Sequence, residues 1–248
     1  MKPTLGMFIL NLKILLSEKV VFIWSVIAPI VMFVVFTFRI ELSDKAPSEI
    51  IQFLSYFWAF IIISTTFNGI GLHLSRMRNH GLLKTYTLIA GGKKPIIFAV
   101  IITQFVVSVV SLIVFTIFVS IVFQLNTIML TLTGLLLLLI TFIPLALISF
   151  SLTYLPIRDT SMSTFLNFGL FILLFFSLSE GTLIIDILNY FNPFVFVMNM
   201  TNILLSTVKL SNTVISFNYI NLLAIFLFML FGIYCYKKLN LISYEYRS

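Results

Sequence analysis

The chain has 248 residues, of which 60% are hydrophobic and only 9% charged, with a net charge of +7 and a mean hydropathy of +1.16. Soluble domains carry about 25% charged residues, so this composition excludes an ordinary soluble protein and indicates an integral membrane protein. Only helices and closed barrels satisfy backbone polar groups in lipid, and the strand-like alternation of a barrel is lacking. We therefore predict one all-α membrane domain over residues 1–248. The single cysteine, Cys235, excludes an intrachain disulfide.

The N-terminal segment, residues 1–19, is predicted to be an amphipathic helix at the membrane interface. Its apolar stripe, with helical spacings of three and four, consists of Leu5, Phe8, Ile9, Leu12, Leu15 and Leu16. Lys13, Glu18 and Lys19 would make the segment an unfavourable span. We therefore expect it to lie on the membrane surface.

Six longer apolar segments are predicted to cross the membrane as helices. They comprise residues 20–38, 51–72, 96–123, 128–153, 163–179 and 217–236, and none contains Asp, Glu, Lys, Arg or His. These spans therefore offer no groups for a proton relay or an intramembrane enzyme. Twelve of the fifteen Lys and Arg residues fall on one side of this topology, together with both termini. Because cytoplasmic connections are enriched in Lys and Arg, both termini are expected in the cytoplasm.

The connection after the second span, residues 73–95, holds five Lys and Arg residues and no acid. It is predicted to contain a short helix that Asn79 caps and Gly91-Gly92 ends, with Pro95 in the first turn of the next span. The apolar side of this helix would carry Leu82, Leu83, Tyr86 and Ile89. Such a helix either docks a peripheral partner or merely rests in the lipid headgroups.

Polar and small side chains share one face of the second span. Ser64, Asn68, Gly71 and Ser75 follow one another at spacings of four, three and four, and Asn167 is a similar polar residue in the fifth span. Such residues either line a translocation pathway or let two helices pack closely and form hydrogen bonds. Both interpretations remain open from the sequence.

The outer connection before the last span, residues 180–216, contains two short apolar runs separated by Asn192-Pro193. Asn can cap a helix and Pro can open one, so a helix is expected to begin here. The two runs predict either a re-entrant hairpin that dips into the membrane from outside or a pair of helices on the membrane surface.

The sequence contains none of the motifs that would give this chain chemistry of its own. GxxxxGK[ST] is missing, as are HExxH and any recognised nucleic-acid-binding module. We therefore expect no catalytic residues, no metal, no cofactor and no nucleic acid on this chain. If ATP drives the protein, another polypeptide binds it.

The order of these elements resembles that of ABC-2 type permeases, the membrane half of type V ABC exporters. That order is an amphipathic N-terminal helix, a proline-bearing first span, a basic loop helix and an apolar hairpin before the last span. The family commonly shows E-R-E-x-G-T-L-E in the cytoplasmic loop, where this chain has "MRNHGLLK". Arg78, Gly81 and Leu83 match the pattern, whereas Met77, Asn79 and Lys84 stand where acids are usual.

The resemblance implies a homodimer or heterodimer in a bacterial cytoplasmic membrane, with separate nucleotide-binding subunits that hold ATP and Mg. The cargo would be hydrophobic or amphipathic, such as a peptide toxin, a bacteriocin or a phenol-soluble modulin, and would be taken from the membrane lipid or its inner surface. The residues expected to couple the chain to the ATPase are Arg76, Arg78, Gly81, Leu82, Leu83 and Tyr86. The pathway would include Ser64, Asn68, Gly71 and Asn167, and Pro193 and Phe194 would lie near an extracellular gate.

Two other classes of function stay open. One is an immunity or regulatory membrane protein that binds a peptide without transport, which would still work beside a catalytically dead ATPase. The other is an ion-coupled secondary carrier, since sodium sites can be built from Ser, Thr, Asn and backbone carbonyls. Inverted repeats would support a carrier, and the sequence shows none.

Overall fold

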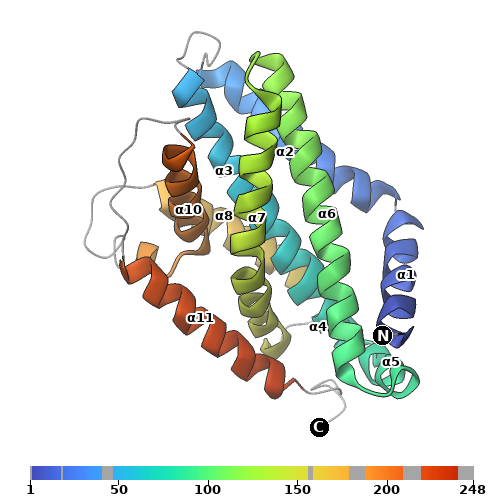
Figure 1. The fold of residues 1–248 in the computed structure, drawn as a ribbon. Coiled ribbons are helices and arrows are strands. Elements are labelled where there is room, and N and C mark those ends of the chain that lie inside the picture. The colour runs from blue at the N-terminus through green and yellow to red at the C-terminus, as the bar shows by residue number, and fades with distance from the viewer. Residues whose placement is uncertain are drawn as a thin grey trace.

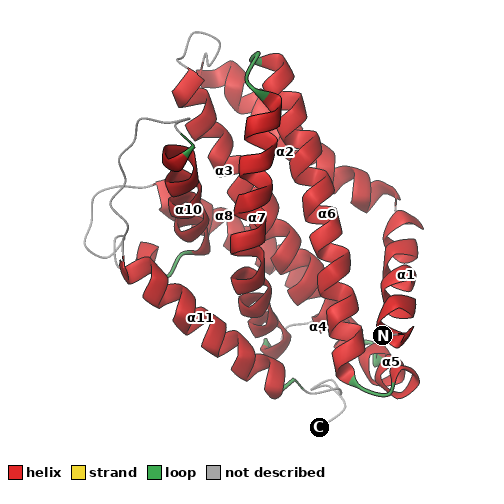
Figure 2. Cartoon of the chain, in the orientation of Figure 1, coloured by secondary structure: helices red, strands yellow, loops and turns green. Residues whose placement is uncertain are grey.

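The computed structural model describes residues 2–17, 19–40, 47–155, 159–178, 188–208 and 219–239, and within these ranges the chain is helical without strands (Figures 1 and 2). The first helices are α1 (Lys2–Ser17), α2 (Lys19–Ile40) and α3 (Pro47–Thr66), which continues through the π-helical turn η2 (Phe67–Leu72) into α4 (His73–Asn79). The later elements are α5 (Leu82–Ala90), α6 (Lys93–Val122), α7 (Thr127–Ser149), the 3₁₀ turn η3 (Phe150–Tyr154), α8 (Asp159–Leu178), α10 (Pro193–Thr207) and α11 (Tyr219–Lys237).

Four helical units in the described ranges are long and apolar enough to cross a membrane. They are Pro47–Asn79, Lys93–Val122, Thr127–Tyr154 and Ser161–Leu178, and they overlap the second to fifth predicted spans. The prediction of an all-α fold is confirmed for the described residues, and four of the predicted spans have the length and composition of membrane-crossing helices. The first and sixth predicted spans overlap α2 and α11, helices of 22 and 19 residues. The total of six spans stays a prediction.

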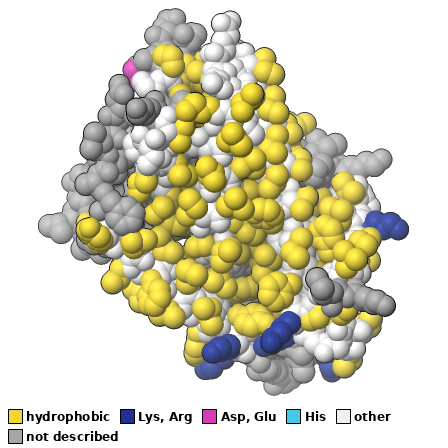
Figure 3. All heavy atoms as spheres, viewed as in Figure 1, with side chains coloured by type: hydrophobic (Ala, Val, Ile, Leu, Met, Phe, Trp, Pro, Cys, Tyr) yellow, Lys and Arg dark blue, Asp and Glu magenta, His cyan; other side chains and the backbone are white. Residues whose placement is uncertain are grey.

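The outer surface of the long helices is apolar. The exposed side of α6 forms one stripe, with intervals of three or four residues, made of Phe98, Ile102, Val106, Val110, Val114, Ile117 and Ile121. Figure 3 shows apolar side chains across most of the face formed by α6, α7 and α11. Soluble proteins rarely expose a continuous apolar surface of this extent, whereas lipid tails are its natural solvent. The surface therefore supports a position in the membrane.

Small polar side chains lie on the inner side of α6 instead. Thr103, Ser108, Ser111, Thr116 and Ser120 are all buried. Trp58 Nε1 of α3 donates a hydrogen bond to Thr116 Oγ1 at 2.9 Å, and the hydroxyls of Thr65 and Ser108 lie 2.7 Å apart. Helices in lipid associate through close packing and such interhelical hydrogen bonds, so these contacts fix α3 against α6.

Basic side chains gather toward one end of the bundle. In Figure 3 the visible Lys and Arg side chains lie at the lower end and on the right edge, and the visible acidic side chain lies at the top. Lys93 Nζ, at the start of α6, donates to the carbonyl oxygens of Tyr236 and Lys237 at 3.3 and 3.2 Å, and so caps the end of α11. Glu49 lies in the first turn of α3, at the far end of that helix from α4. This distribution agrees with the expected topology, whose orientation stays a prediction.

The N-terminal helix differs from its prediction. α1 packs along α6, near α5, instead of crossing the end of the bundle (Figure 1). Its half-buried side chains are Thr4, Met7, Phe8, Asn11, Leu12 and Leu15, whereas Leu5, Ile9 and Leu16 of the predicted stripe are exposed. Lipid solvates an exposed apolar side of a helix. The side of α1 that contacts the protein therefore need not be its most apolar side, and it includes the polar Asn11. The predicted position on the membrane surface is therefore not confirmed.

Gly232 allows the close contact between α11 and α7. An added Cβ at this position would lie only 2.5 Å from the carbonyl carbon of Leu147, which belongs to the backbone and cannot rotate away. We expect Gly232→Ala to force the helices apart at a cost of about 1–3 kcal/mol, and to lower the thermal unfolding temperature in detergent by about 5 °C. Gly169→Ala is the matched control, because a Cβ there meets nothing within 4 Å. Equal effects of the two variants would contradict this packing.

Candidate functional site

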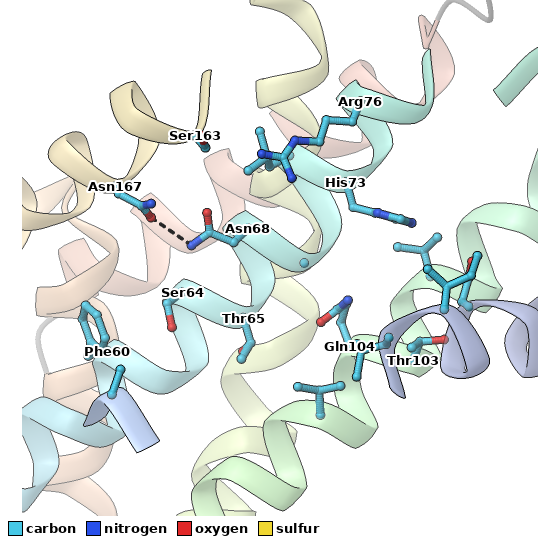
Figure 4. Close-up of a pocket in the computed structure, with 18 of the residues that line it drawn as sticks. Phe60, Ser64, Thr65, Asn68, His73, Arg76, Thr103, Gln104, Ser163 and Asn167 are labelled. Atoms are coloured by element: carbon cyan, nitrogen blue, oxygen red, sulfur yellow. Dashed lines mark hydrogen bonds between the residues drawn. The ribbon is translucent and has the colours of Figure 1, made fainter. Parts of the chain in front are cut away.

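A partly open pocket of about 630 Å³ lies between α1, α2, the α3–η2–α4 unit, α6 and α8 (Figure 4). Its polar lining consists of Asn11, Ser64, Thr65, Asn68, His73, Arg76, Thr103, Gln104, Ser163 and Asn167. Among the described residues that line it there is no Asp or Glu. The described part of the chain also holds no group of three His, Cys, Asp or Glu side chains that could bind a metal ion. The site can therefore bind a ligand through amides, hydroxyls, the His73 imidazole and one permanent cation, Arg76.

The π-helical turn η2 shapes the wall of this pocket. Phe60, Ser64, Asn68, Leu72 and Arg76 all line it and follow one another at intervals of four. In a regular α-helix an interval of four advances by about 400°, so such a row would drift steadily around the helix. A wider turn reduces the drift, and π-helical turns are frequent at functional sites. The irregular turn thus keeps a row of side chains facing one cavity.

The π-helical turn η2 also separates residues that were predicted to line one translocation pathway. Ser64, Asn68 and, from α8, Asn167 line the pocket, but Gly71 does not. An added Cβ at Gly71 would lie 2.5 Å from the carbonyl oxygen of Ser149 and 2.6 Å from Leu152 Cδ1, so Gly71 packs against η3. The predicted placement of Gly71 beside the other three is wrong, because it assumed 3.6 residues per turn throughout.

Three amide side chains of the pocket lining, Asn68, Gln104 and Asn167, contact neighbouring helices or side chains. Asn68 Nδ2 donates to Asn167 Oδ1 at 3.2 Å, which joins η2 to α8 (Figure 4). The carboxamide of Gln104 packs directly over Gly69, where an added Cβ would lie 2.8 Å from Gln104 Cγ. A side chain at position 69 would therefore displace Gln104. Gln104 is the only amide in the apolar run 96–123, a signal that the sequence prediction did not use.

The two arginines of α4 have different environments. Arg76 lines the pocket, and its guanidinium points toward Asn68 and Ser163 in Figure 4. Arg78 is only 3% exposed, and its Nη1 donates to the carbonyl oxygen of Thr153 in η3. Its Nη2 and Nε donate to Asn79 Oδ1 at 2.8 and 3.1 Å. Arg78 therefore connects α4 to η3. This geometry does not favour the predicted direct contact between Arg78 and an ATPase subunit.

The short helix of the basic connection is present as α5. It begins after Gly81 and ends at Gly91, both with φ of +72°, a conformation that glycine adopts without strain. The predicted cap by Asn79 is wrong, since Gly81 is the N-cap residue and the Asn79 oxygen accepts from Arg78.

The predicted apolar face of α5 is split between two directions. Leu83 is fully buried, Tyr86 is half-buried, and Leu82 and Ile89 are exposed together with Leu88. The exposed trio of α5, Leu82, Leu88 and Ile89, is available to a partner or to lipid. Leu83 instead belongs to the core.

The predicted helix start at Asn192-Pro193 is confirmed. α10 begins at Pro193, with the Asn192 side chain accepting from the backbone N–H of Phe194 at 3.0 Å. Asn192 Nδ2 also donates to the carbonyl oxygen of Leu173 in α8 at 2.7 Å. Pro193 and Phe194 are buried, and α10 packs against α3, α7 and α8. The two predicted gate residues are therefore buried against other helices. Residues 180–187 and 209–216 of the expected hairpin fall outside the described ranges.

The described residues form a helical protein with helices long and apolar enough to cross a membrane, and with a partly open pocket lined by polar and apolar side chains. Comparison of the chain with protein-family models, with curated proteins and with solved structures gives no match. The resemblance to ABC-2 permeases therefore rests on the order of sequence elements and on "MRNHGLLK".

Proposed function

We propose that the chain is the membrane-spanning subunit of an ATP-driven exporter that moves a hydrophobic or amphipathic substance out of a bacterial cell. The observation that carries the proposal is the partly open pocket of about 630 Å³ bordered by helices with apolar outer surfaces. Binding pockets for small molecules have this order of volume and a few convergent polar groups. Amphipathic peptides such as bacteriocins are the favoured cargo, because the lining combines apolar side chains with amides.

The connection between this pocket and α5 supports a transport cycle. Arg76 and Leu72 form part of the pocket wall, and the same helical unit continues to Arg78, which is bonded to η3. α5 follows after one glycine turn and carries the exposed trio. A force on α5 would therefore reach the pocket through α4 without a flexible linker. Separate ATPase subunits that bind ATP and Mg would apply this force from the cytoplasm, where both termini lie.

The proposal includes a second permease chain. A dimer, either of two copies or with a similar permease, would place two such pockets above two ATPase subunits. The N-terminal end of α10 is hydrogen-bonded to α8 through Asn192, and this end would take part in release of the cargo on the external side.

The test is purification of the tagged protein from its native membrane in mild detergent. We expect a P-loop ATPase at one copy per permease, with turnover that orthovanadate inhibits. A known exporter complex is purified in parallel, to show that the detergent does not separate a permease from its ATPase. A preparation without ATPase, while the control complex stays intact, would overturn the exporter proposal and favour a peptide-binding protein without transport or an ion-coupled carrier.

A further inference from the structure

We propose that the pocket binds the anionic head group, a carboxylate or a phosphate, of an amphipathic ligand, and that Arg76 is the charge partner of that group. The identification of this ligand as cargo rests on the proposed export function. The binding site itself rests on the geometry of the pocket.

The described lining of the pocket carries one permanent positive charge and no carboxylate. Arg76 lines the pocket, and no acidic side chain accompanies it among the described lining residues. Glu49 is the one acidic residue whose side chain the structure describes, and it lies at the other end of the α3–η2–α4 unit. No hydrogen bond or ion pair joins the Arg76 guanidinium to another described residue. The Arg76 side chain is exposed in the single chain, so its attraction to an anion rests on its charge and on its hydrogen-bond geometry.

Two neutral side chains that can donate hydrogen bonds, Asn167 and Ser163, lie in the pocket with Arg76 (Figure 4). Asn167 uses its side-chain oxygen to accept from Asn68, so its amide nitrogen remains a donor for a ligand. The Ser163 hydroxyl lines the same part of the pocket, and the Arg76 guanidinium points toward it (Figure 4). A guanidinium presents two parallel N–H groups that match the oxygens of a carboxylate or phosphate. Arg76, Asn167 and Ser163 can thus donate hydrogen bonds to the same part of the pocket.

The rest of the pocket lining is apolar, and a small free anion would leave that part of the pocket unfilled. Its walls are Ile14, Leu15, Ala28, Pro29, Phe60, Leu72, Val100 and Val107. Burial of a hydrocarbon chain against these side chains stabilises binding in proportion to the apolar area covered. A charged head at Arg76 and a chain along this wall account for both parts of the lining. A cationic head group would instead meet Arg76 without a compensating carboxylate among the described lining residues.

The experiment is native mass spectrometry of the intact protein in a neutral maltoside detergent, with two matched pairs of probes at equal concentration. One pair is hexadecanoic acid and hexadecanol, and the other is phosphatidic acid and diacylglycerol. We expect the charged member of at least one pair to bind about tenfold more tightly, the usual effect of a charge-assisted hydrogen bond. Preference within the single-chain pair points to a cargo-like amphiphile, and preference within the two-chain pair points to a lipid head group. Both results support the proposal, whereas no preference in either pair overturns it.

Variants assign the preference to the pocket. Arg76→Met should bring the charged and uncharged probes to near-equal binding, and Arg76→Lys should keep part of the difference. Lys94→Met, an exposed cation at the start of α6 outside the pocket, should leave the preference unchanged. If Arg76→Met unfolds, Asn167→Ala tests the same site and should reduce binding of the charged probe several-fold. Unchanged preference in both Arg76→Lys and Asn167→Ala, or in a folded Arg76→Met, would overturn the assignment.

The two proposals fail separately. Probe binding needs no ATPase, so a charge preference without a copurifying ATPase would keep the site and discard the exporter. A copurifying ATPase without any charge preference would keep the exporter and discard the site.

Discussion

Simultaneous replacement of the exposed trio of α5, as Leu82→Ser, Leu88→Ser and Ile89→Ser, is expected to abolish copurification of the proposed ATPase subunit while the protein still folds and inserts. The three side chains are 42, 76 and 71% exposed, so the fold does not depend on their burial. Burying one such side chain in an interface contributes about 1.5–3 kcal/mol, and losing three should weaken docking by at least about a hundredfold. The measurement is recovery of the ATPase on the tagged variant, together with its thermal unfolding temperature.

Two controls separate docking from folding in this experiment. Ile128→Ser, at the other end of the bundle on the first turn of α7, removes an equally exposed apolar side chain and should leave ATPase recovery unchanged. Leu83→Ser should lower stability as well as recovery, because Leu83 is fully buried. Normal recovery with the triple variant would show that α5 only rests in the lipid headgroups, and the coupling prediction would then be wrong.

Long apolar runs made much of the fold predictable. The second to fifth predicted spans correspond to the four long helical units, because a run without ionisable residues has few stable states in lipid other than a helix. Helix ends were predictable where backbone chemistry dictates them. Gly91 ends α5 with a left-handed conformation, and Asn192 and Pro193 start α10 with a cap and a fixed φ.

The orientation of side chains was harder to predict. The placement of Gly71 failed because no sequence signal marked the π-helical turn η2 that changes the helical period. The apolar stripe predicted for α1 did not indicate which side of the helix contacts the protein, because lipid solvates exposed leucines as well as protein buries them. Arg76 and Arg78 are two positions apart and point in different directions, whereas the resemblance to ABC-2 permeases gave them the same predicted role.

Arg78→Met is expected to destabilise the protein by about 1.5–3 kcal/mol, the usual contribution of hydrogen bonds made by a charged group. The change removes the donor to the Thr153 carbonyl oxygen and the two donors to Asn79 Oδ1. Met fills a similar volume but leaves a carbonyl group in η3 without this partner, which adds a desolvation cost. For a chain of this size we expect the thermal unfolding temperature in detergent to fall by about 5 °C or more.

The outcome also decides how Arg78 contributes to coupling. Arg78→Lys keeps the charge but cannot reproduce the planar fork that reaches Thr153 and Asn79 together, so it should restore only part of the stability. Lys237→Met, an exposed cation at the same end of the bundle, should change the unfolding temperature little. If Arg78 instead contacts the ATPase, as the ABC-2 resemblance implies, Arg78→Met would lose the ATPase without losing stability. Loss of stability in Arg78→Met, with partial recovery in Arg78→Lys, would show that the residue acts by holding α4 against η3, and so keeps the pocket wall and α5 in one rigid unit.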